Sequence, residues 1–259
     1  MSAGPPASPR DRDRLAGGHY ARKQIFSRNR LVAWSHGSRF DKARALVEPW
    51  RGGRLLDYGC GDGTFVAMVH AAFAESLGVD ADAAQIEGCA ARLGDLPGVR
   101  FAHTSRLTGA DEGAWSVVTC METLEHCLED DRRAIIARLG RVCAPSGRVI
   151  ISVPIESGPS LLGKQLVRAA AALRGVGDYK YRERYSPAEM LRALVGARIP
   201  RFAYGGDTTS FYGHKGFLWR DVQREIEERL VLETRSFSPM PWAGAALNSQ
   251  VWFVCRPRA

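Results

Sequence analysis

The fold is decided by the stretch Leu55-Leu56-Asp57-Tyr58-Gly59-Cys60-Gly61-Asp62-Gly63-Thr64. It combines a short apolar strand that ends near a carboxylate with a turn in which every second residue is glycine. Glycines in such a turn let the main chain come close to a ligand. The helix that follows offers its N-terminal amides at the same place. The stretch therefore predicts a strand, a ligand-binding turn and a helix of an α/β domain.

Strand-like and helix-like segments alternate beyond this turn. Short apolar runs predict strands, and apolar residues spaced three and four apart predict helices. The expected order is strand 54–58, helix 64–73, strand 76–79, helix 83–91, strand 99–103, strand 115–121, helix 131–142, strand 148–153, helix 187–195, helix 217–230, strand 231–236 and strand 250–255. The alternation predicts an α/β fold with a parallel sheet and helices on both faces.

The glycine spacing and two carboxylates indicate the ligand. A dinucleotide site would show Gly-x-Gly-x-x-Gly to bring a pyrophosphate onto the helix, whereas this turn reads Gly-x-Gly-x-Gly, two residues after Asp57. A carboxylate there suits a cationic ligand and would repel pyrophosphate. Asp80 ends the next expected strand, where a carboxylate can accept hydrogen bonds from both ribose hydroxyls. S-adenosylmethionine, a nucleoside with an amino group and a sulfonium, suits both carboxylates.

With these residues the chain resembles the class I S-adenosylmethionine-dependent methyltransferases, and it is most similar to their ubiquinone-biosynthesis O-methyltransferase branch. The resemblance also rests on Arg39, on Ser152-Val153-Pro154 and on Val118-Thr119-Cys120-Met121-Glu122-Thr123-Leu124-Glu125-His126. It covers residues 39–154 and the last two strands. It implies a Rossmann-like seven-stranded sheet with an antiparallel last strand, and methyl transfer to a small molecule, to oxygen rather than to nitrogen or carbon.

The same resemblance implies a set of cofactor-binding residues. Asp57 and the glycine turn would hold the methionine part, and Arg39 would reach its carboxylate. Asp80 would hold the ribose, and Met121 would flank the adenine. The chain departs from the family at Ser105, which stands where an aspartate often meets the adenine amino group, and at Trp115-Ser116, which replaces a frequent Phe-Asp. The full set is Arg39, Asp57, Gly59, Cys60, Gly61, Gly63, Asp80, Ala81, Ser105, Arg106 and Met121.

His126 and Glu122 are the predicted catalytic residues. Methyl transfer from a sulfonium depends mainly on alignment, and it needs a base only where the acceptor loses a proton. A histidine titrates near neutrality, and Glu122 and Glu125 are close enough in sequence to orient the His126 ring or raise its pKa. The alternative is that His126 caps or packs the start of a helix. His214, which lies between glycines, either meets substrate or belongs to a simple turn.

The chain divides into five expected segments. They are a basic disordered tail (1–18), an N-terminal helical cap (19–50), the cofactor-binding Rossmann-like core (51–157), a lid insertion that shapes the acceptor site (158–213), and a C-terminal helix with the closing strands (214–259). Within the insertion, the apolar stripe over 161–174 with its flanking basic residues either contacts an anionic membrane or packs on the domain as a lid helix, which is favoured. The run 179–185 either binds a base or an acidic substrate or forms an edge strand.

The composition indicates which kinds of partner and which cellular compartment are expected. The net charge is +8, but the 36 Lys and Arg residues are spread over the whole chain, so nucleic acid is disfavoured as a partner. Six cysteines without a Cys-x-x-Cys pair predict a reducing cytoplasm. A cluster of residues at metal-ligand spacing does not stand out, so a metal site is not expected. The oligomeric state is left open.

Three alternatives to a small-molecule methyltransferase stay open at this point. The basic balance also suits an RNA or protein methyltransferase, although Ser152-Val153-Pro154-Ile155 stands where many base N-methyltransferases have Asn/Asp-Pro-Pro-Tyr. The second alternative is an enzyme that uses S-adenosylmethionine for other chemistry. The third is a non-catalytic cofactor-binding protein, because a fold alone does not settle a function.

Overall fold

The computed structural model describes residues 17–18, 30–165, 184–206 and 209–258. The chain forms two compact units, which are described one at a time. The first unit comprises residues 1–121, 138–151 and 255–259, and the second comprises 122–137 and 152–254. None of the described helices combines the length and the hydropathy that a bilayer-spanning segment requires.

Seven strands form one mixed sheet in the order β3-β2-β1-β4-β5-β9-β8, with the last strand antiparallel. They are β1 (Arg54–Tyr58), β2 (Glu75–Asp80), β3 (Val99–His103), β4 (Trp115–Met121), β5 (Cys143–Pro154), β8 (Leu230–Ser238) and β9 (Gln250–Pro257). The predicted Rossmann-like α/β fold is confirmed. The strand β5 begins at Cys143 and not at 148. The sequence prediction missed its first residues because Pro145 and Gly147 are residues typical of turns.

The centre of the first unit is the parallel pairing of β1 with β2 and β4. Leu55 and Leu56 of β1 and Val118 of β4 are fully buried, as expected for parallel strands covered on both faces. The register sets Asp57 opposite Thr119 of β4. A polar pair therefore lies side by side near the carboxyl end of an otherwise apolar strand.

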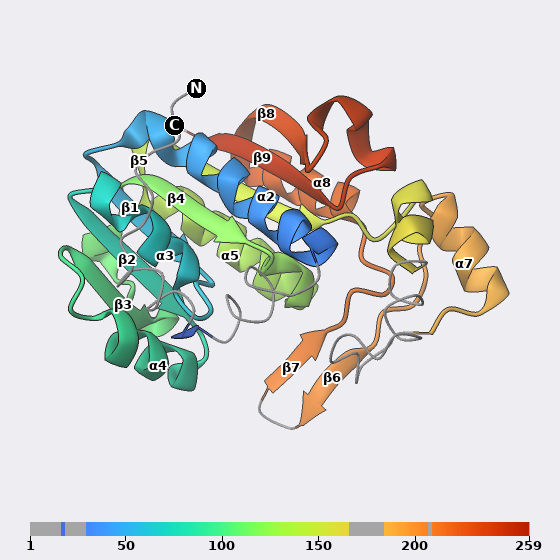
Figure 1. Cartoon of the computed structure of the whole chain (residues 1–259), viewed down its shortest axis with the longest axis horizontal. Coiled ribbons are helices and arrows are strands. Elements are labelled where there is room, and N and C mark those ends of the chain that lie inside the picture. The colour runs from blue at the N-terminus through green and yellow to red at the C-terminus, as the bar shows by residue number, and fades with distance from the viewer. Residues whose placement is uncertain (1–16, 19–29, 166–183, 207–208, 259) are drawn as a thin grey trace. The chain divides into compact units, whose positions relative to one another are not determined.

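Three whole α-helices accompany these strands in the described part of the first unit (Figure 1). They are α2 (Arg30–Val47), α3 (Thr64–Val69) and α4 (Ala83–Leu93). The helix α3 is shorter than the predicted 64–73, because the chain tightens into a 3-10 helix at His70–Ala72. The carboxylate of Asp82 caps α4 by accepting hydrogen bonds from the first-turn amides. The helix α2 lies within the predicted cap, whereas residues 1–16 of the predicted tail and 19–29 of the cap lie outside the described residues.

The second unit contains the first part of α5 (Glu129–Val142) and the elements that follow β5. Besides β8 and most of β9, these elements are α7 (Pro187–Leu194), β6 (Ala203–Gly206), β7 (Thr209–Tyr212) and α8 (Trp219–Arg229). The strands β6 and β7 pair antiparallel as a separate two-stranded sheet, a hairpin within the insertion (Figure 1). Sequence patterns missed this hairpin, because Gly205 and Gly206 interrupt any alternation of apolar residues.

The insertion packs on itself through a short helical segment over residues 159–165 that lies beside α7 (Figure 1). Leu161 is fully buried and packs with Ala193 of α7 and with Ile199. The remainder of the predicted 161–174 helix, and residues 179–183 of the aromatic and basic run, lie outside the described residues.

A buried ion pair joins α5 to α8 within the second unit. The guanidinium of Arg132 donates two hydrogen bonds of 2.5 Å to the two carboxylate oxygens of Glu225. Both residues are less than a tenth exposed. Breaking a buried pair by removing one partner strands the other charge in a poorly solvated place, which costs far more than the pair itself contributes.

We predict that Glu225→Ala lowers the free energy of unfolding by about 3–5 kcal/mol. The double variant Arg132→Met/Glu225→Leu should regain most of the loss, because it leaves no unpaired charge. Urea denaturation followed by circular dichroism measures both. Glu48→Ala is the control, since Glu48 pairs with Arg51 at the surface and should cost less than about 1 kcal/mol. Equal losses for Glu225→Ala and Glu48→Ala would show that the buried pair is unimportant.

Candidate functional site

The glycine turn after β1 has the conformation that its sequence predicts. Gly59, Gly61 and Gly63 all have positive φ angles, of 74°, 52° and 71°, a region that other residues rarely adopt. A β-carbon at Gly63 would lie 2.9 Å from Leu93 and Phe101, whereas one at Gly61 would meet no atom within 4 Å. The main chain is therefore packed tightly at one glycine and open at another, as a turn that approaches a ligand requires.

Asp57 is a buried carboxyl group beside this turn. It is 2% exposed, and the Thr119 hydroxyl donates a hydrogen bond of 2.6 Å to its Oδ1. Burial raises the pKa of Asp57 to about 7, with a smaller contribution from Asp80, and the bond from Thr119 acts in the opposite direction. A cation that approached Asp57 would stabilise the ionised form, so this site suits the ammonium group of a ligand.

Asp80 connects β2 to the glycine turn. Its Oδ2 accepts a hydrogen bond of 2.9 Å from the amide of Gly61, and its Oδ1 accepts one of 2.9 Å from the amide of Asp82. A carboxylate oxygen has two lone pairs, so each oxygen keeps acceptor capacity for a hydroxyl. The two amides fix the carboxylate in position, which suits the predicted role on a ribose.

A histidine that the sequence patterns did not indicate joins two of the predicted cofactor-binding residues, Ala81 and Ser105. His103 Nε2 lies 3.0 Å from the carbonyl oxygen of Ala81, and Nδ1 lies 2.7 Å from Ser105 Oγ. Because a carbonyl only accepts, Nε2 carries the proton and Nδ1 accepts from Ser105. Arg106 follows in the same 3-10 turn and is exposed. Only its position at the end of β3, level with Asp80 in the parallel register, could have indicated His103.

The remaining predicted cofactor residues also lie in the first unit. Cys60 is buried in the turn, and its amide donates to the Val79 carbonyl oxygen at 3.0 Å. Arg39 is buried on α2, and Met121 is the last residue of β4. The structure thus gathers the turn, Asp57 and Asp80, while contacts of Arg39 and Met121 with a cofactor stay predictions.

The predicted catalytic residue Glu122 has a strained backbone. Its φ is 51°, the one positive value among the described non-glycine residues, and such a conformation costs about 1–3 kcal/mol. Ser152 holds it from both ends: its carbonyl accepts from the Glu122 amide at 3.0 Å, and its hydroxyl donates to Oε1 at 3.2 Å. Strain of this kind concentrates at functional sites.

His126 ends the short 3-10 helix η6 (Leu124–His126) and has a defined tautomer. Its Nδ1 lies 2.9 Å from the main-chain carbonyl oxygen of Tyr212, so Nδ1 carries the proton and Nε2 of the neutral ring carries the lone pair. Burial lowers the pKa of His126 below its usual value, and His214 and Arg201 lower it further, against the Tyr212 bond and Glu122. The ring is therefore a neutral base at neutral pH.

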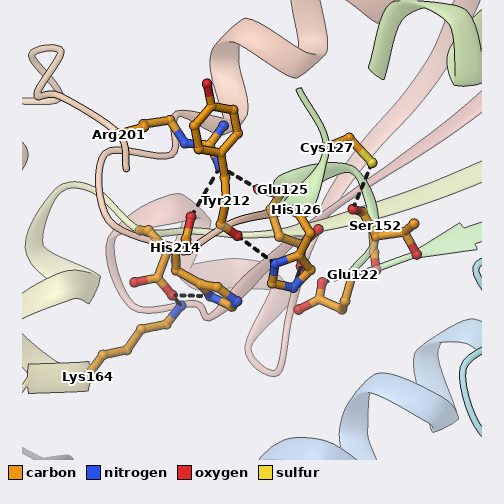
Figure 2. Close-up of polar contacts among 12 residues, drawn as sticks. Glu122, Glu125, His126, Cys127, Ser152, Lys164, Arg201, Tyr212 and His214 are labelled. Atoms are coloured by element: carbon orange, nitrogen blue, oxygen red, sulfur yellow. Dashed lines mark hydrogen bonds and ion pairs between the residues drawn. The ribbon is translucent and has the colours of Figure 1, made fainter. Parts of the chain in front are cut away.

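Further ionisable groups surround His126 in the second unit (Figure 2). The His214 ring lies 5.0 Å from the His126 ring between centroids, and the fully buried Glu125 approaches His126 Nε2 to 3.9 Å. On its other side, His214 Nδ1 lies 3.5 Å from Glu156 Oε1, which also accepts a hydrogen bond of 2.8 Å from Lys164. His214 thus belongs to a cluster of ionisable side chains. The sequence did not indicate this cluster, because the glycines on both sides of His214 are equally typical of a simple turn.

This cluster also contains a set of groups that could hold a metal ion, which the sequence did not indicate. Ligand atoms of Glu125, His126 and His214 all lie within 4.8 Å of one another. Two imidazoles and a carboxylate are donors that divalent transition metals accept. Such an ion would use Nε2 of His126, because Nδ1 is bonded to the carbonyl, so ion binding and base catalysis would compete for one nitrogen.

Arg201 ties η6 to the chain that follows the β6–β7 hairpin. One of its terminal nitrogens donates to the carbonyl oxygens of Glu125 and, at 3.1 Å, of Gly213. Its guanidinium also lies over the Tyr212 ring, 4.3 Å from the centroid (Figure 2). Arg201 therefore holds the segment that carries His126 against the segment that carries its carbonyl partner.

Comparison with known proteins assigns the family. A family model described as a methyltransferase domain matches residues 33–193, more than half of the chain. The chain belongs to this methyltransferase family. The resemblance to S-adenosylmethionine-dependent methyltransferases, and S-adenosylmethionine as the cofactor of that family, are confirmed.

The similarity between this methyltransferase and its curated relatives extends over only part of each chain. The Ubiquinone biosynthesis O-methyltransferase of Mesorhizobium japonicum is 29% identical over 168 residues, which are 62% of this chain and 66% of the relative. That of Psychrobacter cryohalolentis is 30% identical over 159 residues, 58% of this chain and 60% of the relative. The chain thus spans less than two thirds of these relatives.

Solved structures share the fold of this methyltransferase. The N-methyltransferase NodS from Bradyrhizobium japonicum, in complex with S-adenosyl-L-homocysteine, has a TM-score of 0.54 at 12% identity and covers 96% of this chain and 97% of its own. The magnesium protoporphyrin IX methyltransferase from Synechocystis has a TM-score of 0.52 at 16% identity and covers 95% of this chain and 93% of its own. At these identities the likeness concerns the fold and does not extend to the acceptor.

We predict that the affinity for S-adenosylmethionine depends on pH through Asp57. Because its pKa is raised to about 7, the carboxyl must lose its proton before it can pair with a cation. Affinity should rise by roughly tenfold between about pH 6 and about pH 8 and then level off. Asp57→Asn should bind weakly and without this slope, whereas Asp41→Asn, an exposed residue of α2, should keep it. Calorimetric titration measures these affinities, and a slope that survives in Asp57→Asn would contradict the assignment.

We predict that Arg201→Met raises the pKa of His126. The substitution removes a positive charge that lowers this pKa and leaves in place the Tyr212 carbonyl that bonds to Nδ1. Nitrogen NMR of the histidine rings should show the upward shift with the Nδ1-protonated form retained in the neutral ring. Arg192→Met, on the exposed face of α7, serves as the control. An unchanged His126 titration in Arg201→Met would show that the charge of Arg201 does not act on this ring.

Proposed function

We propose that the chain transfers the methyl group of S-adenosylmethionine to a hydroxyl oxygen of a small molecule, with His126 as the general base. The observation that carries the proposal is the hydrogen bond from His126 Nδ1 to the Tyr212 carbonyl oxygen. It leaves Nε2 as the basic atom of a ring whose pKa is below its usual value. A hydroxyl acceptor must lose its proton, and a positioned neutral imidazole can take it.

Residues of the first unit would hold the cofactor. Asp57 offers a carboxylate to the ammonium group, and Asp80 offers one acceptor site on each oxygen to the ribose hydroxyls. The open side of Gly61 leaves room beside the main chain. The bound cofactor supplies a methyl carbon that is already electrophilic, so the protein contributes mainly alignment.

Glu122 and Glu125 would support the base. Glu122 raises the pKa of His126 by its charge, and Glu125 approaches Nε2 in a buried place. When the ring takes up a proton, these carboxylates stabilise the imidazolium that forms. Glu122 is therefore proposed as a residue that assists proton transfer, in agreement with its strained backbone.

A small-molecule acceptor, partly apolar or anionic, is favoured over a macromolecule. The relatives at 29–30% identity are named for ubiquinone biosynthesis, and this supports a small molecule and an oxygen atom without naming either. Arg201 places positive charge near His126, which suits an acceptor with an anionic group. An RNA or protein acceptor and a non-catalytic role would each give a distinct result in a test with purified protein.

The test combines purified protein, S-adenosylmethionine and matched small acceptors that carry a phenolic hydroxyl, a carboxylate or an amine. We expect S-adenosylhomocysteine to form with hydroxyl acceptors, at a rate that exceeds the rate with the matched amines. Mass spectrometry of cell extract treated with the protein then identifies the natural acceptor by its added methyl group. Methylation of RNA or protein only, or cofactor binding without any turnover, would contradict the proposal.

We predict that His126→Asn lowers kcat by about 100-fold to 10,000-fold, the usual contribution of general base catalysis. The affinity for S-adenosylmethionine should not change. In the wild type, kcat/KM for the acceptor, measured at a saturating concentration of S-adenosylmethionine so that Asp57 stays paired with the cofactor, should fall only at acidic pH, because the pKa of His126 is lowered. This acidic limb should vanish in His126→Asn. His70→Asn is the control, since His70 bonds to the Ala67 carbonyl in the first unit. A small effect on kcat with an intact acidic limb would assign the base to another group.

A further inference from the structure

The four most exposed large apolar side chains among the described residues all belong to the second unit. Trp242 is 82% exposed, Val195 74%, Leu191 65% and Leu247 59%. Leu191 and Val195 lie four residues apart at the C-terminal end of α7 and so share one face of the helix. Apolar groups of this size at such exposure, when they gather on one surface, mark an interaction site.

The helix α7 is apolar on more than its packed side. Ala193 is buried against Leu161 and Ile199, while Leu191 and Val195 project away from this contact into solvent. A helix that packs one apolar face inside the protein and exposes another is expected to contact a second apolar surface through the exposed face. The exposed stripe is therefore a candidate docking element.

The loop that carries Trp242 and Leu247 has no charge and a defined shape. The loop contains the 3-10 segment η7 (Pro241–Ala246), and no charged residue occurs between Ser236 and Cys255 in a chain that is 25% charged. Asn248 is 1% exposed, and its side chain makes three hydrogen bonds of 2.6 Å to the main chain of Met240 and Gly244. Trp242 is thus presented without the entropic cost of ordering a loop on binding.

The end of α7 and the η7 loop border the same surface depression. Leu194 and Val195 line it from α7, Ala245 and Ala246 line it from the loop, and its volume is about 240 Å³. Arg220 lines this depression and also a neighbouring one, which Arg198 and Arg224 line as well. We call Leu191, Val195, Trp242 and Leu247 with these three arginines the Trp242 surface.

The charge beside the apolar groups is positive. Arg198 and Arg224 are 75% and 65% exposed in their side chains and share one carboxylate, that of Asp221. Arg220 is exposed and lies 4.6 Å from the centroid of the Trp219 ring. In the two depressions next to the apolar groups, three guanidinium groups face the one carboxylate of Asp221 and leave an excess of positive charge. Glu129 and Glu228 line another depression together with Arg198 and Arg224.

We propose that the Trp242 surface docks the protein on an anionic lipid bilayer. Tryptophan and leucine insert at the boundary between headgroups and acyl chains, and arginines beside them meet lipid phosphates. A rigid uncharged loop flanked by guanidinium groups has this composition. An acidic protein partner would match the arginines but would gain less from an uncharged loop with an almost fully exposed indole.

This surface differs from the membrane contact that the sequence suggested over 161–174. Leu161 of that segment is buried, and Lys164 donates to Glu156 and to the main-chain carbonyl oxygens of Ile155 and Ser249. The ammonium group of Lys164 is therefore directed into the protein and does not serve lipid phosphates. Residues 166–174 lie outside the described part, and the proposal does not use them.

The experiment is cosedimentation of the full chain with vesicles of phosphatidylcholine alone and of phosphatidylcholine mixed with phosphatidylglycerol. We expect binding to the mixed vesicles that weakens with salt. The double variant Trp242→Ser/Leu247→Ser should bind at least about tenfold more weakly, and Arg198→Gln/Arg220→Gln should lose the preference for the anionic lipid. Trp34→Ser is the matched control, because Trp34 is a 51% exposed tryptophan of α2 and its loss should not change binding.

Brominated lipids give a second readout that does not depend on a loss of binding. They should quench tryptophan fluorescence of the wild type, and Trp242→Phe should bind vesicles but lose most of this quenching. Absence of vesicle binding, or binding that Trp242→Ser/Leu247→Ser leaves intact, would overturn the proposal.

A wild-type protein that forms a concentration-dependent dimer, which this double variant converts into a monomer, would assign the surface to a second copy of the chain. Methyl transfer to a water-soluble acceptor should be the same in these variants, so failure here is separable from failure of the proposed activity.

Discussion

The hydroxyl of Thr119 donates a hydrogen bond of 2.6 Å to the carboxyl of Asp57, and neither residue is exposed by more than 2%. A buried carboxyl without a partner is costly, so the pairing of β1 with β4 must keep the register that sets residues 57 and 119 side by side. The bond satisfies Asp57 only in part, and its pKa stays raised to about 7. The first unit thus keeps one acid ready for a cation, and the glycine turn beside it provides the room.

In the second unit the corresponding constraint is the link between η6 and the β6–β7 hairpin. Arg201 bonds to main-chain oxygens on both segments, and His126 bonds to the carbonyl of Tyr212. These contacts fix the position and the tautomer of the imidazole, while burial keeps it neutral. The two units therefore contribute different chemistry: one holds an acid that a cation would ionise, and the other holds a base that a hydroxyl would protonate.

Local patterns predicted the sheet and the cofactor turn because each depends on residues that are neighbours in sequence. The bounds of β1, β3 and β4 followed from apolar runs, and the carboxylates Asp57 and Asp80 followed from the strand ends. The roles of Arg201, Glu156 and His214 could not be predicted in this way, since their partners lie far away along the chain. The sequence did not predict the β6–β7 hairpin for a related reason. Its glycines interrupt the alternation of apolar residues that indicates a strand, and the pairing of its two strands is visible only in three dimensions.

The partner of His126 is a main-chain carbonyl and not a side chain. A substitution at residue 212 changes the side chain that the hairpin displays but leaves the carbonyl oxygen where it is. The hairpin can therefore accumulate substitutions, and with them new acceptor preferences, without loss of the histidine tautomer. Only an insertion or deletion that reroutes the backbone would remove the bond. This separates the evolution of specificity from the retention of the base, and it makes loop length a stricter requirement than loop sequence.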